Sequence, residues 1–304
     1  MTYTCYRLTF KAESPVFIGD KKIGIIQQTR RYIPGKTMWG AITANVTYGL
    51  IDDGVTYSPA LYKDIGECVK SCIRTTYFYP IIDSKDVLSP RFTEEGLQYG
   101  QMSENEFEST FIKSFVSTAT SGDRGAAKDE SLHETEYVVN RIKSDGEYKQ
   151  VNWIGYLFIK GCENSKYSLN NHGNFNDIEL ECDEHSVKLS DTLKQLHVGG
   201  DNRYGFGRLA LTTPQMSNDV FGFKINLNSL KFNIIKQNPI FAHLNLNCNY
   251  EKPYLGNIEP IVSRVYGKKG FGRDIVPHGI AFTPGTCFTE EISNIEIKSF
   301  GVLQ

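Results

Sequence analysis

The sequence predicts an α+β fold. Three observations support this prediction: strand-like alternation near the N-terminus, a helical pattern that follows it, and a short helix that leads into a further strand near residue 200. The 304 residues are 40% hydrophobic and 22% charged, which is typical of folded chains. A chain of this length can form a substantial core and two modest domains.

The first elements can be placed in order. Residues 5–12 alternate apolar and polar side chains, which predicts a half-buried strand. Pro34 and Gly35 then interrupt the chain, and apolar residues recur at helical spacing over 38–46. We therefore expect the first helix to begin near Thr37.

The middle of the chain is less regular. Residues 52–150 carry little periodic pattern and include a small, polar, glycine-containing stretch at 117–137, so we interpret them as a large insertion. Strand character returns at 151–159. A short helix over 190–198 and a strand over 208–212 follow.

This order of elements predicts a ferredoxin-like (RRM-like) domain at 1–213, with the insertion at about 52–150. Residues 214–304 contain further alternating runs. We interpret them as a smaller strand-rich region and a candidate for a degenerate second ferredoxin-like unit.

Composition narrows the classes of function. The 33 basic and 35 acidic side chains leave a net charge of -2, so any nucleic-acid surface must be local. The sequence shows no apolar run of about 18 residues and no signal-like N-terminus. Seven irregularly spaced cysteines favour a reducing compartment over a disulfide framework. We therefore expect a cytoplasmic protein without membrane contact.

The string HVGGDNRYGFGRLAL at 197–211 is the most informative motif. Its glycines let main-chain N–H groups approach an anion, its arginines bring positive charge, and its aromatic rings can stack on bases. It precedes a strand, unlike a dinucleotide-binding G-x-G-x-x-G motif, which opens a helix. The alternative is a glycine-rich hairpin whose rings pack into the core. The candidate RNA-binding residues here are Gly199, Gly200, Arg203, Tyr204, Gly205, Phe206, Gly207 and Arg208.

Two basic segments support the same class of function. Residues 1–50 hold seven basic and two acidic side chains, a local charge of +5. Residues 264–273 repeat the mixture of glycine, aromatic ring and cation. Such patches are typical of surfaces that bind an RNA backbone, although each could also be a solvated face. The candidates are Arg30, Arg31, Lys268, Lys269 and Arg273.

Four strings occur in a characteristic order: SPVFIGD, RRYIPGKTMWGAI, ATSGDRGAAKDESLHETEYV and GGDNRYGFGRLAL. Together they resemble the motif set of the RAMP superfamily, the repeat-associated proteins of CRISPR systems, over roughly residues 5–212. The chain is most similar to the type III-D RAMP subunit and to subunits that cap the repeat-derived 5′ end of guide RNA. The resemblance implies a subunit of a type III effector complex that holds guide RNA in antiviral defence.

The resemblance also implies partners and contact residues. The partners would be guide RNA, other RAMP subunits and the large subunit of a type III complex, with target RNA as a further candidate. The glycine-loop residues would contact RNA. So would Lys36, Thr37 and Trp39, because N–H groups at the start of a helix favour phosphate.

Catalysis has two candidate forms. Related backbone subunits cut target RNA with an aspartate and a divalent metal, and here Asp20 is the candidate, with Mg²⁺ as the cofactor only in that case. A metal-independent guide-RNA-processing endoribonuclease would need a histidine to move protons, and His133, His197 and His278 lie near the motifs above. Neither the aspartate nor any of these histidines has a supporting partner residue at a fixed spacing in the sequence. We therefore favour a structural role without a cofactor, with an RNA-recognition module outside CRISPR as a further alternative.

Cys68 and Cys72 lie four residues apart and could share one helix face. A zinc site needs two further ligands, and no second pair of Cys or His at finger spacing is present in the sequence. We interpret the two residues as ordinary thiols.

Overall fold

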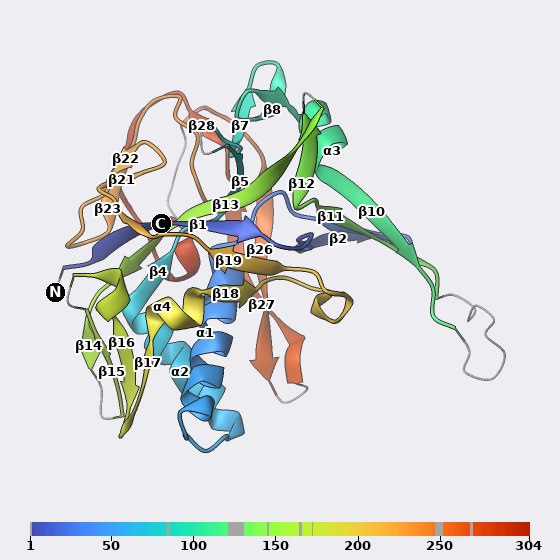
Figure 1. The fold of residues 1–304 in the computed structure, drawn as a ribbon. Coiled ribbons are helices and arrows are strands. Elements are labelled where there is room, and N and C mark those ends of the chain that lie inside the picture. The colour runs from blue at the N-terminus through green and yellow to red at the C-terminus, as the bar shows by residue number, and fades with distance from the viewer. Residues whose placement is uncertain are drawn as a thin grey trace.

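The computed structural model describes residues 2–83, 86–120, 131–144, 146–163, 166–171, 173–246, 252–267 and 270–304. It shows a strand-rich mixture of sheets and helices, which confirms the predicted class of mixed α and β structure (Figure 1). No helix in these ranges is long and apolar enough to cross a bilayer.

A central antiparallel sheet organises the molecule, with the order β18-β19-β1-β13-β5-β6. The first strand lies in its middle and pairs along its length with the longest strand of the sheet, from Thr4↔Ile159 to Lys11↔Asn152. The strands of this sheet are β1 (Thr4–Ala12), β4 (Ile73–Thr75), β5 (Tyr79–Ile82), β6 (Asp86–Val87), β12 (Arg141–Ser144), β13 (Glu147–Ile159), β18 (Gln195–His197), β19 (Arg208–Leu211) and β20 (Gln215–Met216). The strands predicted at 5–12, 151–159 and 208–212 are therefore confirmed as β1, β13 and β19.

Helices pack against one face of this sheet. Helix α1 (Gly35–Asp52) starts two residues before the predicted Thr37, and its residues Met38, Ile42 and Val46 are buried as the helical spacing predicts. The other helices are α2 (Pro59–Cys72), α3 (Glu104–Phe111), α4 (Leu189–Leu193) and the 3₁₀ turns η1 (Phe175–Asp177) and η2 (Asn202–Tyr204).

The helix predicted over 190–198 is only partly correct. Helix α4 ends at Leu193, and the next residues form β18, in which Leu196 pairs with Leu209 of β19. Leu196 is buried. Pairing with the central sheet therefore overrides the helical pattern of this segment.

Smaller sheets surround the central one. Residues 52–150, interpreted above as an insertion, contain α2 and α3 and also contribute β4 and β5 to the central sheet. The peripheral strands before residue 190 are β2 (Gly19–Ile23), β3 (Ile26–Thr29), β7 (Pro90–Thr93), β8 (Gly96–Tyr99), β9 (Met102–Ser103), β10 (Ile112–Ser117), β11 (His133–Val138), β14 (Cys162–Glu163), β15 (Tyr167–Asn170), β16 (Glu179–Cys182) and β17 (His185–Lys188).

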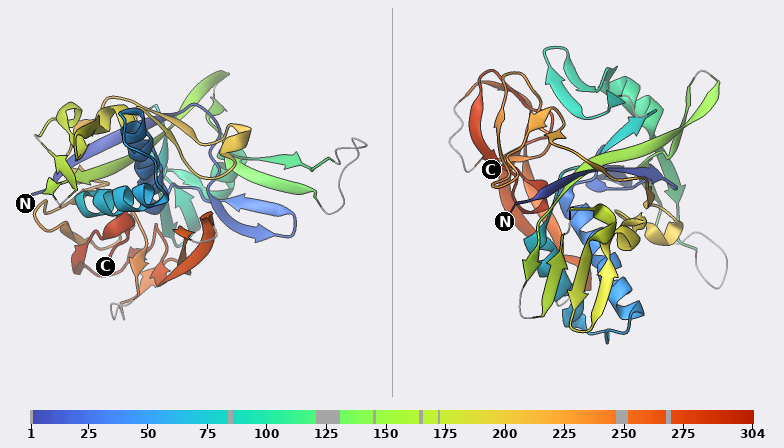
Figure 2. Two further views of the ribbon diagram at one scale, coloured as in Figure 1. Left: turned by 90° about the horizontal axis from the view of Figure 1, so that it is seen from below. Right: turned by 60° about the vertical axis from the view of Figure 1, so that its left-hand side comes forward.

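The C-terminal part is rich in short strands, and these lie on the side of the central sheet away from β14–β17 (Figure 2). Its elements are β21 (Asp219–Val220), β22 (Phe223–Lys224), β23 (Lys231–Ile234), β24 (Leu244–Asn245), β25 (Tyr254–Leu255), β26 (Ile258–Gly267), β27 (Gly270–Phe282), β28 (Cys287–Phe288), β29 (Ile292–Glu296) and η3 (Ser299–Gly301). The division at residue 213 stays a prediction.

Two hydrophobic cores lie on the two faces of the central sheet. Along β13, Leu157 belongs to the core that contains the helices, whereas Tyr156 and Phe158 belong to the core that contains the C-terminal strands. Successive residues of a strand point to opposite faces, so one strand supplies both cores.

Candidate nucleic-acid interface

The glycine-rich loop joins β18 to β19, so it closes a hairpin of the central sheet. This corrects the expectation that it directly follows a helix. Two of its glycines are required by geometry: Gly199 (φ +77°) and Gly207 (φ +81°) each have a carbonyl oxygen 2.0 Å from where a Cβ would lie. The ring of Phe206 packs against Tyr137, with centroids 5.2 Å apart.

The main-chain N–H groups of this loop bind mostly within the protein. Gly200 donates to Phe17 O at 2.9 Å, Gly205 to Asn202 O at 3.0 Å and Gly207 to Pro15 O at 2.7 Å. An N–H group that already donates to a carbonyl is not available to a phosphate. The loop therefore offers RNA its side chains rather than these N–H groups.

The side chains of the loop differ in availability. Arg203 is exposed and forms no ion pair with any residue that the structure describes, and Tyr204 is 68% exposed. The Nε atom of Arg208 pairs with Glu13 Oε2 at 2.8 Å. Arg203 and Tyr204 are thus the loop residues best placed to meet a ligand.

The predicted arginine pair 30–31 is held inside the protein. Arg30 forms ion pairs with Asp20 at 2.9 Å and Glu259 at 2.8 Å, and it donates to Tyr32 Oη at 2.5 Å. Arg31 pairs with Glu108. Both guanidinium groups therefore neutralise internal carboxylates, which weakens their prediction as RNA contacts.

Asp20, the candidate catalytic aspartate, is the other partner of Arg30. Within the described part of the chain it belongs to no group of three or more Cys, His, Asp or Glu residues that could ligate a metal. Its carboxylate therefore has a structural role in this fold, and its catalytic role stays a prediction that this geometry does not favour.

Glu259 connects Arg30 to a buried histidine. The Nε2 atom of His243 lies 2.6 Å from Glu259 Oε1, and its Nδ1 atom lies 2.6 Å from Tyr77 Oη. Burial would raise the pKa of Glu259, but the hydrogen bond from His243 and the charge of Arg30 outweigh it and hold that pKa at about 2.

The pKa values fix the direction of these hydrogen bonds. Burial lowers the pKa of His243, so the ring is neutral at pH 7. The ionised Glu259 can only accept, so Nε2 of His243 carries the proton and donates to it. The Nδ1 atom of His243 then accepts the hydrogen bond that Tyr77 donates.

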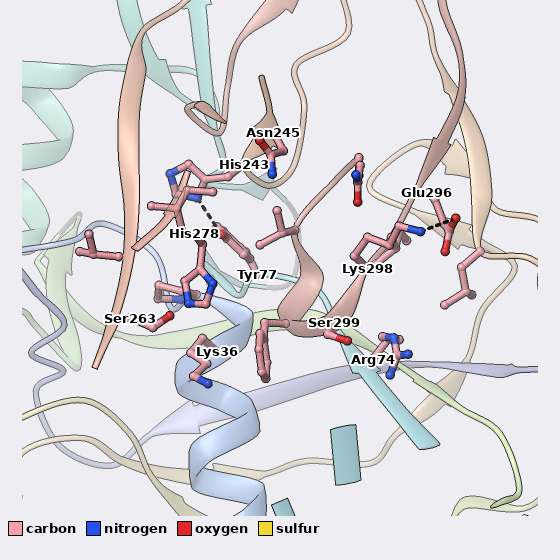
Figure 3. A pocket seen from close by; sticks show the side chains of 18 of the residues that line it. Lys36, Arg74, Tyr77, His243, Asn245, Ser263, His278, Glu296, Lys298 and Ser299 are labelled. Carbon is pink, nitrogen blue, oxygen red and sulfur yellow. Dashed lines mark hydrogen bonds and ion pairs between the residues drawn. The ribbon is translucent and has the colours of Figure 1, made fainter. Parts of the chain in front are cut away.

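This network borders a cavity of about 760 Å³ between the start of α1, the β26–β27 hairpin and the C-terminal residues. Two predicted contact residues, Arg30 and Lys36, line it, whereas the glycine loop does not. Figure 3 shows Lys36 and His278 on one side of the cavity and Arg74 and Lys298 on the other. Lys160 completes the set of cations that line it.

The cavity carries unbalanced positive charge. Arg30 is paired as described, and Lys298 pairs with Glu296 at 2.8 Å. The other cations, Lys36, Arg74 and Lys160, form no ion pair with a described residue. Several uncompensated cations around one hollow attract an anion.

Lys36 is the most constrained of these cations. Its Nζ atom lies 3.9 Å from the centre of the Phe300 ring and 4.3 Å from that of Trp39, so two rings orient it. Burial, and then the charge of Lys70, lower the pKa of Lys36. A bound anion would oppose that shift and favour the charged ammonium.

The remaining predicted residues contribute less to the cavity. Trp39 donates from Nε1 to Gly66 O at 3.1 Å, and the N–H of Thr37 donates to Pro34 O at 2.9 Å. Lys268 and Lys269 lie outside the described residues, as does the side chain of Arg273. No sequence pattern points to Arg74, Lys160 and Lys298, because only the fold brings these distant residues to one cavity.

Comparisons with known proteins show a likeness of fold. No family model and no curated protein match the sequence. A chain in a cryo-EM structure of the type III-B Cmr-beta complex bound to cognate target RNA and AMPPnP aligns with a TM-score of 0.55 and 12% identity, over 93% of this chain and 85% of that chain. A chain of the same complex bound to cognate target RNA aligns with a TM-score of 0.53 and 11% identity, over 93% and 86% of the two chains. The protein thus has the fold of a chain found in type III CRISPR effector structures.

Proposed function

We propose that this chain is an RNA-binding structural subunit of a type III CRISPR ribonucleoprotein, which holds guide RNA by its repeat-derived 5′ part. The observation that carries the proposal is the likeness of fold to chains of the type III-B Cmr-beta complex over 93% of this chain. The ordered RAMP motifs support the same class independently of the structure. They favour the type III-D or 5′-capping branch of the superfamily.

The strand order supports a ferredoxin-like unit. Strand β1, helix α1, strands β5 and β13, helix α4 and strand β19 follow one another along the chain, and the strands lie in the order β19-β1-β13-β5. A split βαβ arrangement has this order, with one strand inserted between two parallel ones. In this arrangement, residues 52–150 supply strand β5 of the unit, and their other elements are additions to it.

The cationic cavity and the exposed side chains of the loop would hold RNA in different ways. Lys36, Arg74 and Lys160 would neutralise phosphates in the cavity. Arg203 would contact phosphate and Tyr204 would stack on a base, since both are exposed. Neither contact would read a base sequence, because phosphate contacts and stacking carry no base-specific hydrogen bonds.

The β26–β27 hairpin would contact a neighbouring subunit. Five aliphatic side chains on the described part of this hairpin are exposed: Ile258, Val262, Ile275, Val276 and Ile280. A neighbouring subunit could bury them. Exposed apolar groups gathered on one element are typical of protein interfaces. One of these residues, Val262, also lines the cavity, so a neighbour that covers it would lie next to bound RNA.

Salt dependence of RNA binding tests the proposal. The triple variant Lys36→Gln, Arg74→Gln, Lys160→Gln should bind single-stranded guide RNA more weakly, because it removes the unpaired cations of the cavity. The slope of log affinity against log salt should fall by about 2, at about 0.7 for each lost phosphate contact. Fluorescence anisotropy over a salt series measures both effects.

A matched control has the same change of charge elsewhere: Lys224→Gln, Lys231→Gln, Lys236→Gln, three exposed lysines outside the cavity. Equal weakening by both triples would reject the cavity as the RNA site. Sequencing the RNA that co-purifies with the protein from its host tests the guide assignment. Reads without repeat-derived 5′ ends would contradict it.

One observation favours a second candidate, metal-independent processing of guide RNA. His278 lines the same cavity as Lys36, and burial, then the charge of Lys36, lower its pKa. A neutral imidazole beside a cation could take a proton from an RNA 2′-hydroxyl. Cleavage of repeat RNA in the presence of a chelator, lost in His278→Ala, would support this candidate.

A further inference from the structure

A group of cysteines lies between α2 and the β14–β17 sheet, away from the cationic cavity. Cys68 and Cys72 are one turn apart on α2, and Cys162 begins β14. The Sγ atoms of these three residues all lie within 4.8 Å of one another. From the sequence alone, Cys68 and Cys72 are interpreted as ordinary thiols because the sequence has no second pair of Cys or His at finger spacing. The fold brings Cys162 to them from 90 residues beyond Cys72.

A fourth cysteine faces the same space. Cys162 pairs with Leu169 of β15, and Leu169 pairs with Leu180 of β16. Cys182 is two residues beyond Leu180, so it points to the same face of the sheet as Cys162. Burial, and then the charge of neighbouring Cys182, raise the pKa of the Cys68 thiol to about 11. The helix and the sheet therefore bring three sulfur atoms within 4.8 Å of one another, and Cys182 lies on the same face of the sheet, close enough to influence Cys68.

The disulfide includes only two of these four cysteines. In the structure Cys72 and Cys162 are joined by a disulfide, while Cys68 and Cys182 are unpaired and buried. The Ser71 hydroxyl donates to Cys68 O at 2.8 Å, and its oxygen lies 3.2 Å from Cys72 Sγ and 3.8 Å from Cys162 Sγ. Buried thiols do not ionise without a compensating cation, and thiolate sets of this kind select thiophilic divalent ions.

We propose that, in its reduced form, this cluster binds one zinc ion through Cys68, Cys72 and Cys162, with Cys182 as the fourth ligand. A dithiol reductant supplies two electrons and two protons to the Cys72–Cys162 disulfide and becomes a disulfide itself. Zinc then replaces the thiol protons, which pass to solvent. The ion fastens the small β14–β17 sheet to α2, as a structural zinc site does.

Metal analysis of the reduced protein tests this site. The full-length chain is reduced with dithiothreitol, equilibrated with Zn²⁺, freed of unbound metal and measured by mass spectrometry. We expect one zinc ion per chain, falling to background in Cys68→Ser and in Cys72→Ser. Cys287→Ser is the matched control, because Cys287 is also buried but lies in β28 of the C-terminal part; it should keep its zinc.

A cobalt titration of the unmutated protein does not depend on the variants folding. Co²⁺ should give the intense absorption of tetrahedral thiolate coordination, and Cys182→Ser should change that spectrum by replacing one sulfur ligand. A reduced chain that binds neither ion in excess metal would overturn the proposal and leave a disulfide only. Equal zinc loss in Cys287→Ser would also overturn it.

Discussion

Glu259 is the residue on which the charge network beside the cavity depends. Its folded pKa of about 2 lies below the ordinary value of 4.5, so the unfolded chain takes up a proton in a pH range where the folded chain does not. The stabilisation of the folded chain by ionised Glu259 is present above pH 4.5 and is lost as the pH falls toward 2. The shift corresponds to about 2 kcal/mol after allowance for partial exposure.

Glu259→Gln should therefore remove most of this acid dependence. Urea unfolding at a series of pH values would show a smaller decrease in the free energy of unfolding below pH 4.5 than in the unmutated chain. Glu296→Gln is the matched control, because it removes a carboxylate paired with Lys298 at the same cavity. If both variants keep the original slope, the network does not set the pKa of Glu259.

The glycine loop allows a second test with single residues. Gly199 and Gly205 both have positive φ, at +77° and +86°. A Cβ at Gly199 would meet Phe17 O at 2.0 Å, whereas nothing lies within 4 Å at Gly205. Gly205→Ala should cost about 1 kcal/mol for the left-handed backbone, and Gly199→Ala clearly more. Thermal unfolding measures the difference, and equal costs would show that the hairpin does not pack on residue 17 as described.

Single elements differ in how far the sequence could predict them. The alternation in β1 and the helical spacing in α1 depend on neighbouring residues, so both could be predicted. The prediction for 190–198 was wrong in its second half because pairing with Leu209 decides it. The internal ion pair of Arg30 could not be predicted for a similar reason: its partner Glu259 lies 229 residues away. A local pattern contains no information about such partners.

Strand β13 offers a test at the scale of an element. Gly155 lies in its centre, and a Cβ there would be 2.6 Å from the Phe78 ring, which is fully buried. Gly155→Ala should therefore destabilise the protein by about 1 to 3 kcal/mol through overpacking. Phe78→Leu makes room, so the same alanine should cost less in the double variant. Denaturant unfolding of the four proteins checks this, and strictly additive costs would argue against the contact.

At the scale of the whole molecule, the central sheet is covered on both faces. The helices cover one face, and the C-terminal strands cover the other, where the side chains of Tyr77, Tyr79, Tyr156 and Phe158 are buried. The cationic cavity is built from both parts of the chain, since α1 supplies Lys36 and β27 supplies His278. The proposed binding of RNA at this cavity would therefore need both parts of the chain.

The predicted boundary at residue 213 can be tested by cutting the chain there. A fragment of residues 1–213 would expose the aromatic face of the sheet, where each of the four rings is at most 7% exposed in the whole chain. We expect this fragment to bind a hydrophobic dye and to unfold without a cooperative transition, because one face of its sheet has lost its core. Co-expression with residues 214–304 should restore cooperative unfolding and salt-dependent RNA binding. A fragment that alone is monomeric and unfolds cooperatively would instead show that the N-terminal domain is independent, and that the second core adds little to its stability.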